Sequence, residues 1–190
     1  MAALCGSLSA ALCAMVSSLT YRQKGMESQR DDMSSAALGA QALKHELSTL
    51  VEEDARAFDA VVAARRIKAK TEDEKAAKRE AVEKATEGAA LVPMRVLEKS
   101  VEVVELCATL ASMGYEACVS DAGTAASVAL AAAQGAYLNV VINASVLEDR
   151  GRRDQLLVEA RHLLENVRQK AAGAFEVAAK RAMGEDPGSG

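Results

Sequence analysis

Aromatic side chains, proline and histidine are all scarce in this sequence. Only 3% of the 190 residues are aromatic, none is Trp, and there are two Pro and two His. This composition argues against a β-sandwich or barrel, and against the aromatic platforms on which single-stranded nucleic acid stacks. Because hydrophobic residues still make up 50% of the chain, the core must be built from Ala, Leu, Val and Met, which favours closely packed helices.

Charge of a single sign is also missing. Lys and Arg number 23 and Asp and Glu 27, and the two signs are interspersed, so no face carries the field that would attract a nucleic acid. The four Cys form no CxxC pair and only two His are available, so the sequence indicates neither a zinc site nor a disulfide framework. We expect no bound metal, no nucleic-acid partner and a location in the cytoplasm or another reducing compartment, such as an organellar matrix.

The stretch from Ala2 to Leu19 carries no charge and is long enough to suggest a membrane span or a signal peptide. Its many Ser, Cys, Gly and Ala residues disfavour a membrane, and no basic residue precedes it. We interpret it as a central helix buried in a bundle, with no membrane span. Gly6, Ala10 and Ala14 are spaced four residues apart, which lets another backbone approach one face closely.

Apolar residues then recur at three- and four-residue steps, as in amphipathic helices. One helix is predicted from Met26 to about Arg66. Thr71, with Glu74 three residues later, forms a capping box that starts the next helix. Gly114 is expected to end that helix.

Two further helices complete the predicted bundle. Ser120 is expected to cap the first, which continues through Tyr137–Asn143 although that run is rich in β-branched side chains, because an isolated strand would have no partner. The second extends from about Asp154 to Met183. The chain is therefore predicted to be one all-α domain over residues 1–183, a multi-helix bundle around the central small-residue helix, with a flexible tail at 184–190.

Asp54 is a polar residue at a position where an apolar one is expected. It shares a helical stripe with Val51 and Phe58, and burying an ionised carboxylate there is costly unless it is paired. Two interpretations carry equal weight: a structural salt bridge to a neighbouring helix, or a functional acid.

Asn139 and Asn143 lie four residues apart, so a helix places both amides on one face of an apolar segment. Each amide offers two donors and an acceptor, which suits the edge of a heterocycle such as a pterin. For either Asn alone, an interhelical hydrogen bond is the commoner explanation. Asp121 lies in the first turn of its predicted helix, where the helix dipole favours an acid without any function.

Basic residues form two small clusters. Most such clusters are simply solvated, but they also suit an anionic ligand group such as a tail of glutamate residues. The first cluster comprises Arg22 and Lys24, and the second comprises Arg65, Arg66, Lys68 and Lys70.

Four segments carry a resemblance to a known family. AALCGSLSAALCAMVSSLT, LVEEDARAFDAV, CVSDAG and GAYLNVVIN resemble, in order and spacing, the formiminotetrahydrofolate cyclodeaminase and methenyltetrahydrofolate cyclohydrolase family, which includes the C-terminal domain of formiminotransferase-cyclodeaminase. The resemblance covers nearly the whole chain. It implies a helical bundle that forms a tight homodimer, with folate bound near the subunit contact.

The resemblance also implies which residues act. Asp54, on the matched aspartate of the EEDARAF motif, and Asp121 are implied as the catalytic acid and base. The asparagines would orient the pterin, and the basic residues would hold the glutamate tail, polyglutamylated or not. The implied substrate-binding residues are Ser120, Asn139, Asn143, Arg22, Lys24, Arg66 and Lys68.

The reaction that the resemblance implies is a ring closure. N10 of 5-formiminotetrahydrofolate attacks the formimino carbon and ammonia leaves, which gives 5,10-methenyltetrahydrofolate without a metal or redox cofactor. The alternative within the family is methenyltetrahydrofolate cyclohydrolase, in which water attacks the methenyl carbon. The residues at hand do not separate the two reactions.

The chain departs from the family pattern in two places. The short helix and Gly-rich loop that usually precede the small-residue helix are absent before Met1, and the usual Lys-Leu-Pro-Lys motif stands here as residues 66–69, Arg-Ile-Lys-Ala. These departures favour a third interpretation: a catalytically impaired member that serves as a structural subunit or adaptor, in a larger assembly or with a formiminotransferase domain. The retained Asp54, Asp121 and two asparagines favour an enzyme, because a bundle released from folate chemistry could replace them.

Overall fold

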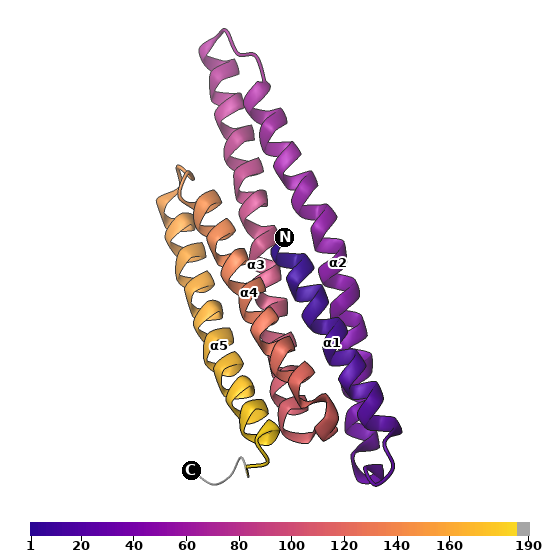
Figure 1. Cartoon of the computed structure of the whole chain (residues 1–190). Helices are drawn as coiled ribbons and strands as arrows, with labels where there is room; N and C mark the ends of the chain where they lie inside the picture. Colours follow the sequence, from indigo (N-terminus) through magenta and orange to yellow (C-terminus); the bar gives the residue numbers. More distant parts are fainter. Residues whose placement is uncertain (186–190) are drawn as a thin grey trace.

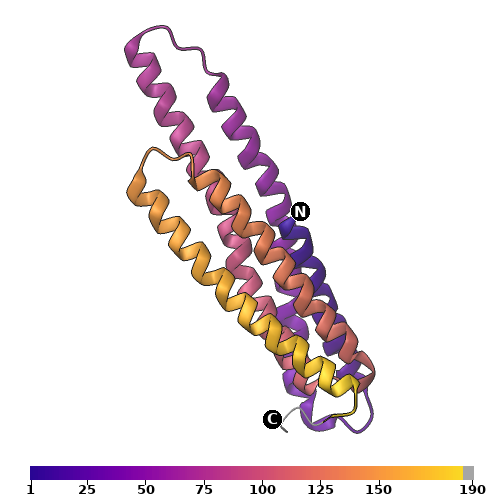
Figure 2. The same cartoon turned by 60° about the vertical axis from the view of Figure 1, so that its left-hand side comes forward.

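A computed structural model describes residues 1–185 of the chain, and every regular element in that range is helical, which confirms the all-α prediction. Five long helices lie side by side in an elongated bundle (Figures 1 and 2). Two short 3-10 turns, η1 (Glu27–Gln29) and η2 (Glu116–Cys118), lead into the second and fourth of them. The five helices are α1 (Ala2–Arg22), α2 (Arg30–Arg66), α3 (Glu72–Met113), α4 (Val119–Ala144) and α5 (Arg150–Ala182).

Small residues let α1 settle between α2 and α4. A Cβ on Gly6 would lie only 3.0 Å from a methyl carbon of Leu47 on α2, so this close contact is possible because Gly6 has no side chain. On the other side, the Ser9 hydroxyl donates to the carbonyl of Ala125 on α4 at 2.7 Å. Close packing thus fixes α1 against two helices at once.

The outward side of α1 is open in the single chain. Its large apolar side chains are 40% to 54% exposed, so within one chain α1 is covered on one side only. By length and composition, α1 and the segment Glu116–Ala144 are each apolar enough to cross a membrane, a test that helices of a soluble core also meet. The exposed large hydrophobic side chains of α1 are Leu4, Leu8, Met15, Leu19 and Tyr21.

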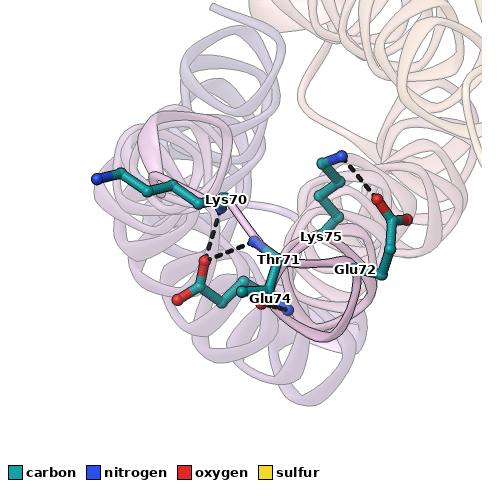
Figure 3. Close-up of polar contacts among 5 residues, drawn as sticks. All are labelled: Lys70, Thr71, Glu72, Glu74 and Lys75. Atoms are coloured by element: carbon teal, nitrogen blue, oxygen red, sulfur yellow. Dashed lines mark hydrogen bonds and ion pairs between the residues drawn. The ribbon is translucent and has the colours of Figure 1, made fainter.

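Helices α2 and α3 form an antiparallel hairpin that extends beyond the other helices (Figure 1). The predicted capping box is present at its tip: the Glu74 amide donates to the Thr71 hydroxyl at 3.2 Å, and the Thr71 amide donates to the Glu74 carboxylate at 3.0 Å (Figure 3). The Lys70 amide donates to the same carboxylate at 2.6 Å. These backbone donors lower the pKa of Glu74, because they stabilise its ionised form.

The start of α4 corrects one prediction. The helix begins at Val119, so Ser120 lies inside its first turn and does not cap it. The reason is a tertiary contact: the Tyr115 amide donates to the hydroxyl of Thr20 on α1 at 2.9 Å, and the Cys118 amide then closes a turn onto the Tyr115 carbonyl at 2.8 Å. The segment Tyr137–Asn143 is helical, as predicted.

Helix ends in the lower bundle are closed by backbone and side-chain donors. Gly114 ends α3 as predicted, and Arg181 of α5 donates to the carbonyls of Ala111 and Gly114, each at 2.7 Å. Of the predicted tail, Gly184 has φ +75° and Glu185 donates to the Lys180 carbonyl at 3.0 Å, so both belong to the C-terminal cap of α5. Residues 186–190 of that tail lie outside the described residues.

The capping box predicts a local effect of mutation. Thr71→Ala should speed hydrogen exchange of the Glu74 amide about five-fold, because the lost cap is worth roughly 1 kcal/mol to the first turn of α3. Thr49→Ala is the matched control, since the Thr49 hydroxyl donates within α2 to the His45 carbonyl and caps nothing. Unchanged exchange at Glu74 in Thr71→Ala would contradict the role of this cap.

Candidate functional site

A cleft of about 530 Å³ lies between α2 and α4, with Ala89 of α3 at its floor. Its volume falls within the range of small-molecule sites, about 300 to 1,000 Å³. The cleft begins where α1 stops, since Ala2 packs against Gly135, one turn before the first α4 residue of the cleft. The α2 wall consists of Asp54, Ala55, Phe58, Val61 and Arg65, and the α4 wall of Asn139, Ile142, Asn143 and Val146.

The α2 wall is one stripe of a helix. Asp54, Phe58, Val61 and Arg65 follow steps of four, three and four residues, so they share one face. Eleven residues separate Asp54 from Arg65, which corresponds to about 16 Å along the axis. The wall therefore carries an acid at one end, a base at the other and apolar side chains between them.

Asp54 is exposed, which corrects the expectation that its stripe is buried. Phe58, on the same stripe, is 66% exposed. The physical reason is the length of α1: the contact between Gly6 and Leu47 lies near its N-terminal end, so α1 does not reach the part of α2 that carries Asp54. The predicted salt bridge to a neighbouring helix is made by the adjacent residue instead, from Glu53 to Arg95 of α3.

Asn143 is held by a carbonyl that a proline leaves free. Pro93 lies inside α3 and has no N–H, so the carbonyl of Ala89 lacks its usual partner four residues on. The Asn143 side-chain amide donates to this carbonyl at 3.0 Å, which is the interhelical hydrogen bond anticipated from the sequence. The Asn139 amide donates within its own helix to the Gly135 carbonyl at 2.9 Å. Both asparagines are thereby oriented at the wall of the cleft.

The other predicted site residues lie away from the cleft. Asp121 precedes Asn139 by eighteen residues, or about five turns, so the two share a face of α4 but are about 27 Å apart. Ser120 lines a separate hollow with Tyr115 and Arg181, at the end of the bundle where α3 meets α4.

The basic residues fall in two places. Arg22 lines a hollow against α2 at the C-terminal end of α1, and Lys24 follows it in the turn toward η1. Arg66 and Lys68 lie where α2 ends, near the hairpin tip, and neither lines the cleft. The base that does line it is Arg65, which the sequence placed in the same cluster without assigning it to the site. The four-residue step from Val61 is the signal that identifies it.

The fold and the cleft define an all-helical bundle with an open cleft whose α2 wall carries an acid at one end, a base at the other and apolar side chains between them. A sequence profile described as formiminotransferase-cyclodeaminase matches residues 1–162. A methenyltetrahydrofolate cyclohydrolase of Methylorubrum extorquens is 34% identical over 163 residues, covering 86% of this chain and 78% of the relative. The chain belongs to the formiminotransferase-cyclodeaminase family.

Two other similar proteins differ in length: one is about three times as long as the matched region, and the other is close to this chain in length. The formimidoyltransferase-cyclodeaminase of Sus scrofa is 30% identical over 90% of this chain, but the matched part is only 32% of that relative, so the chain spans about a third of its length. The crystal structure of formiminotetrahydrofolate cyclodeaminase from Thermotoga maritima superposes with a TM-score of 0.79 at 26% identity, covering 96% of this chain and 85% of that one. This chain is therefore similar in sequence to proteins named as a cyclohydrolase and as cyclodeaminases, and it shares its fold with a cyclodeaminase.

The pairing of Asn143 with the carbonyl of Ala89 predicts a coupled pair of mutations. Asn143→Ala should lower the free energy of unfolding by about 1 to 3 kcal/mol, because it strands a buried carbonyl. In a Pro93→Ala background the same change should cost about 1 kcal/mol less, since the new N–H at position 93 supplies the missing donor. Urea unfolding of the four proteins measures both costs. Equal costs in the two backgrounds would contradict this account.

Proposed function

We propose that the chain acts on a tetrahydrofolate one-carbon derivative as a formiminotetrahydrofolate cyclodeaminase. The observation that carries the proposal is the juxtaposition, in a cleft of ligand size, of Asp54 with Asn139 and Asn143. A second candidate, methenyltetrahydrofolate cyclohydrolase, is supported by the name of the bacterial relative that is 34% identical. Both reactions use the same folate framework, and each needs a base for the proton of its nucleophile and an acid for its leaving nitrogen.

Ring closure requires two proton movements, and a carboxylate at the cleft can perform them. The formimino group reacts in its protonated form, with its nitrogen as =NH2+. As N10 attacks the formimino carbon, a new C–N bond forms, the C=N π electrons pass to that nitrogen to give –NH2, and Asp54 accepts the N10 proton. Asp54 then returns this proton to the –NH2 group as its C–N bond breaks, so that ammonia leaves and the methenyl cation remains. In the cyclohydrolase direction the same carboxylate would take a proton from the attacking water. Asn139 and Asn143 would fix the pterin, which reduces the entropy cost of the reaction.

A homodimer would complete the site. The exposed apolar side of α1 and the mouth of the cleft lie along one groove between α2 and α4, so one surface offers both an apolar contact and a ligand site. In a two-fold dimer whose axis is perpendicular to the helices, the lower end of one copy lies beside the upper end of the other. Such a dimer would bring Arg22, Lys24, Ser120 and Asp121 of the partner subunit toward the cleft.

The rival proposal is a structural subunit or adaptor, which an assay separates from an enzyme. The methenyl chromophore appears when 5-formiminotetrahydrofolate is the substrate and disappears when methenyltetrahydrofolate is hydrolysed. If the parent protein produces neither absorbance change and does not bind folate, the structural role is the remaining explanation. A formiminotransferase domain supplied separately would then be the first partner to test, given the larger size of the animal relatives.

Asp54→Asn tests the catalytic assignment. Turnover should fall by a factor on the order of 100 to 10,000, the range for loss of one acid or base. The melting temperature should stay unchanged, because Asp54 is exposed and makes no ion pair within residues 1–185. Asp59→Asn, an exposed acid on the same helix that does not line the cleft, is the matched control. Parent-like turnover of Asp54→Asn would reject its catalytic role.

Leu8→Glu tests the dimer. Leu8 is 53% exposed on the open side of α1, so a charge there should leave the fold intact but convert a dimer into a monomer, and activity should fall with it. Light scattering after size exclusion measures the mass, and circular dichroism checks the fold. Val158→Glu, an exposed position on α5, is the control that should remain dimeric and active. A parent protein that is monomeric at micromolar concentration would refute the dimer.

A further inference from the structure

The two ends of the cleft differ in charge. Asp54 and Asn139 lie at one end, and Arg65 and Val146 at the other, because α2 and α4 run in the same direction along the bundle (Figure 1). Between them the α2 wall is apolar, with Ala55, Phe58 and Val61, whereas the α4 wall carries Ile142 and the amide of Asn143. A ligand that fits this order has a polar, hydrogen-bonding part at one end, an apolar middle and an anionic group at the other end.

Arg65, like Arg66, forms no ion pair within residues 1–185, unlike Arg56 and Arg95. Arg56 pairs with Glu52 on its own helix, and Arg95 pairs with Glu53. Within residues 1–185, no carboxylate forms an ion pair with Arg65, although its side chain lines the cleft. A guanidinium without a partner beside an apolar wall is suited to accept a carboxylate from a ligand, and its planar fork can bind both oxygens at once.

Neighbouring Arg66 is less suited to this role. Successive residues are about 100° apart around a helix, so Arg66 projects away from the stripe that Arg65 shares with Asp54 and Val61. The cleft accordingly includes Arg65 and not Arg66.

We propose that Arg65 binds the glutamate carboxylate of the folate, so that the substrate lies along the cleft with its ring system at Asp54, its aminobenzoyl group against Phe58 and its glutamate at Arg65. This inference rests on the proposed folate activity and adds to it a direction of binding and a residue that determines specificity. It transfers the role of tail anchor from Arg66, where the sequence resemblance put it, to the adjacent residue. Arg65 is remote from the reacting atoms and affects binding rather than proton transfer.

The experiment combines two substrates with variants of one arginine. The substrates are the glutamate-bearing folate and its pteroate analogue, which lacks the glutamate. Arg65→Ala should raise KM for the folate about 10- to 100-fold with kcat nearly unchanged, since one charge-assisted interaction is lost. With the pteroate analogue, Arg65→Ala and the parent should have equal KM values. Arg65→Lys should recover part of the loss, and Arg56→Ala, an exposed arginine of the same helix outside the cleft, is the control.

Three results would overturn the inference. One is an unchanged KM of Arg65→Ala for the folate while the parent is active, which leaves the proposed function intact. A second is an equal rise in KM for both substrates, which would indicate a structural effect. The third is a rise in KM with Arg66→Ala but not with Arg65→Ala. Absence of turnover by the parent with either substrate would instead reject the proposed function, and this inference with it.

Discussion

The close approach of α1 to its neighbours is the contact on which the rest of the structure depends. Gly6 lets Leu47 reach the α1 backbone, and Ser9 reaches the Ala125 carbonyl, so α1 is wedged between α2 and α4. Helix α1 has 21 residues and α2 has 37. The N-terminal end of α1 packs at Gly135 of α4, and beyond it the cleft lies between α2 and α4.

Backbone carbonyls that lack a hydrogen-bond partner within their own helix provide further contacts between the helices. The Ala89 carbonyl, left free by Pro93, is taken by Asn143, and the carbonyls at the end of α3 are taken by Arg181. In both cases a side chain from a distant helix satisfies a buried acceptor, which would otherwise cost about 1 to 3 kcal/mol. These bonds tie α3 to α4 and α5, and one of them also sets the floor of the cleft.

Local sequence signals predicted the helices well, and long-range contacts explain where the prediction was wrong. The capping box at Thr71 involves neighbouring residues only and is present in full. Ser120 did not become a cap, because a bond from Tyr115 to Thr20, distant in sequence, sets the start of α4. Periodicity correctly placed Asp54 on one stripe with Phe58, but it could not tell that α1 stops short of that stripe. The position of Arg65, rather than Arg66, in the cleft wall was missed although the four-residue step from Val61 to Arg65 indicates it.

The projecting hairpin gives the cleft unequal walls. The continuous hydrophobic core includes Leu50 and Ala90 but no residue between them, so the upper parts of α2 and α3 lie outside it, and polar contacts of Glu83 and Glu87 connect α3 to the start of α5. The α4 wall, in contrast, belongs to a helix whose small residues are fully buried throughout the core. Segments with few core contacts open at lower free energy than the core itself. A ligand that contacts both walls would therefore restrict the motion of the hairpin, and this restriction would reduce its net binding free energy. A second molecule that binds the hairpin tip and restricts the same motion would then raise the affinity for the ligand.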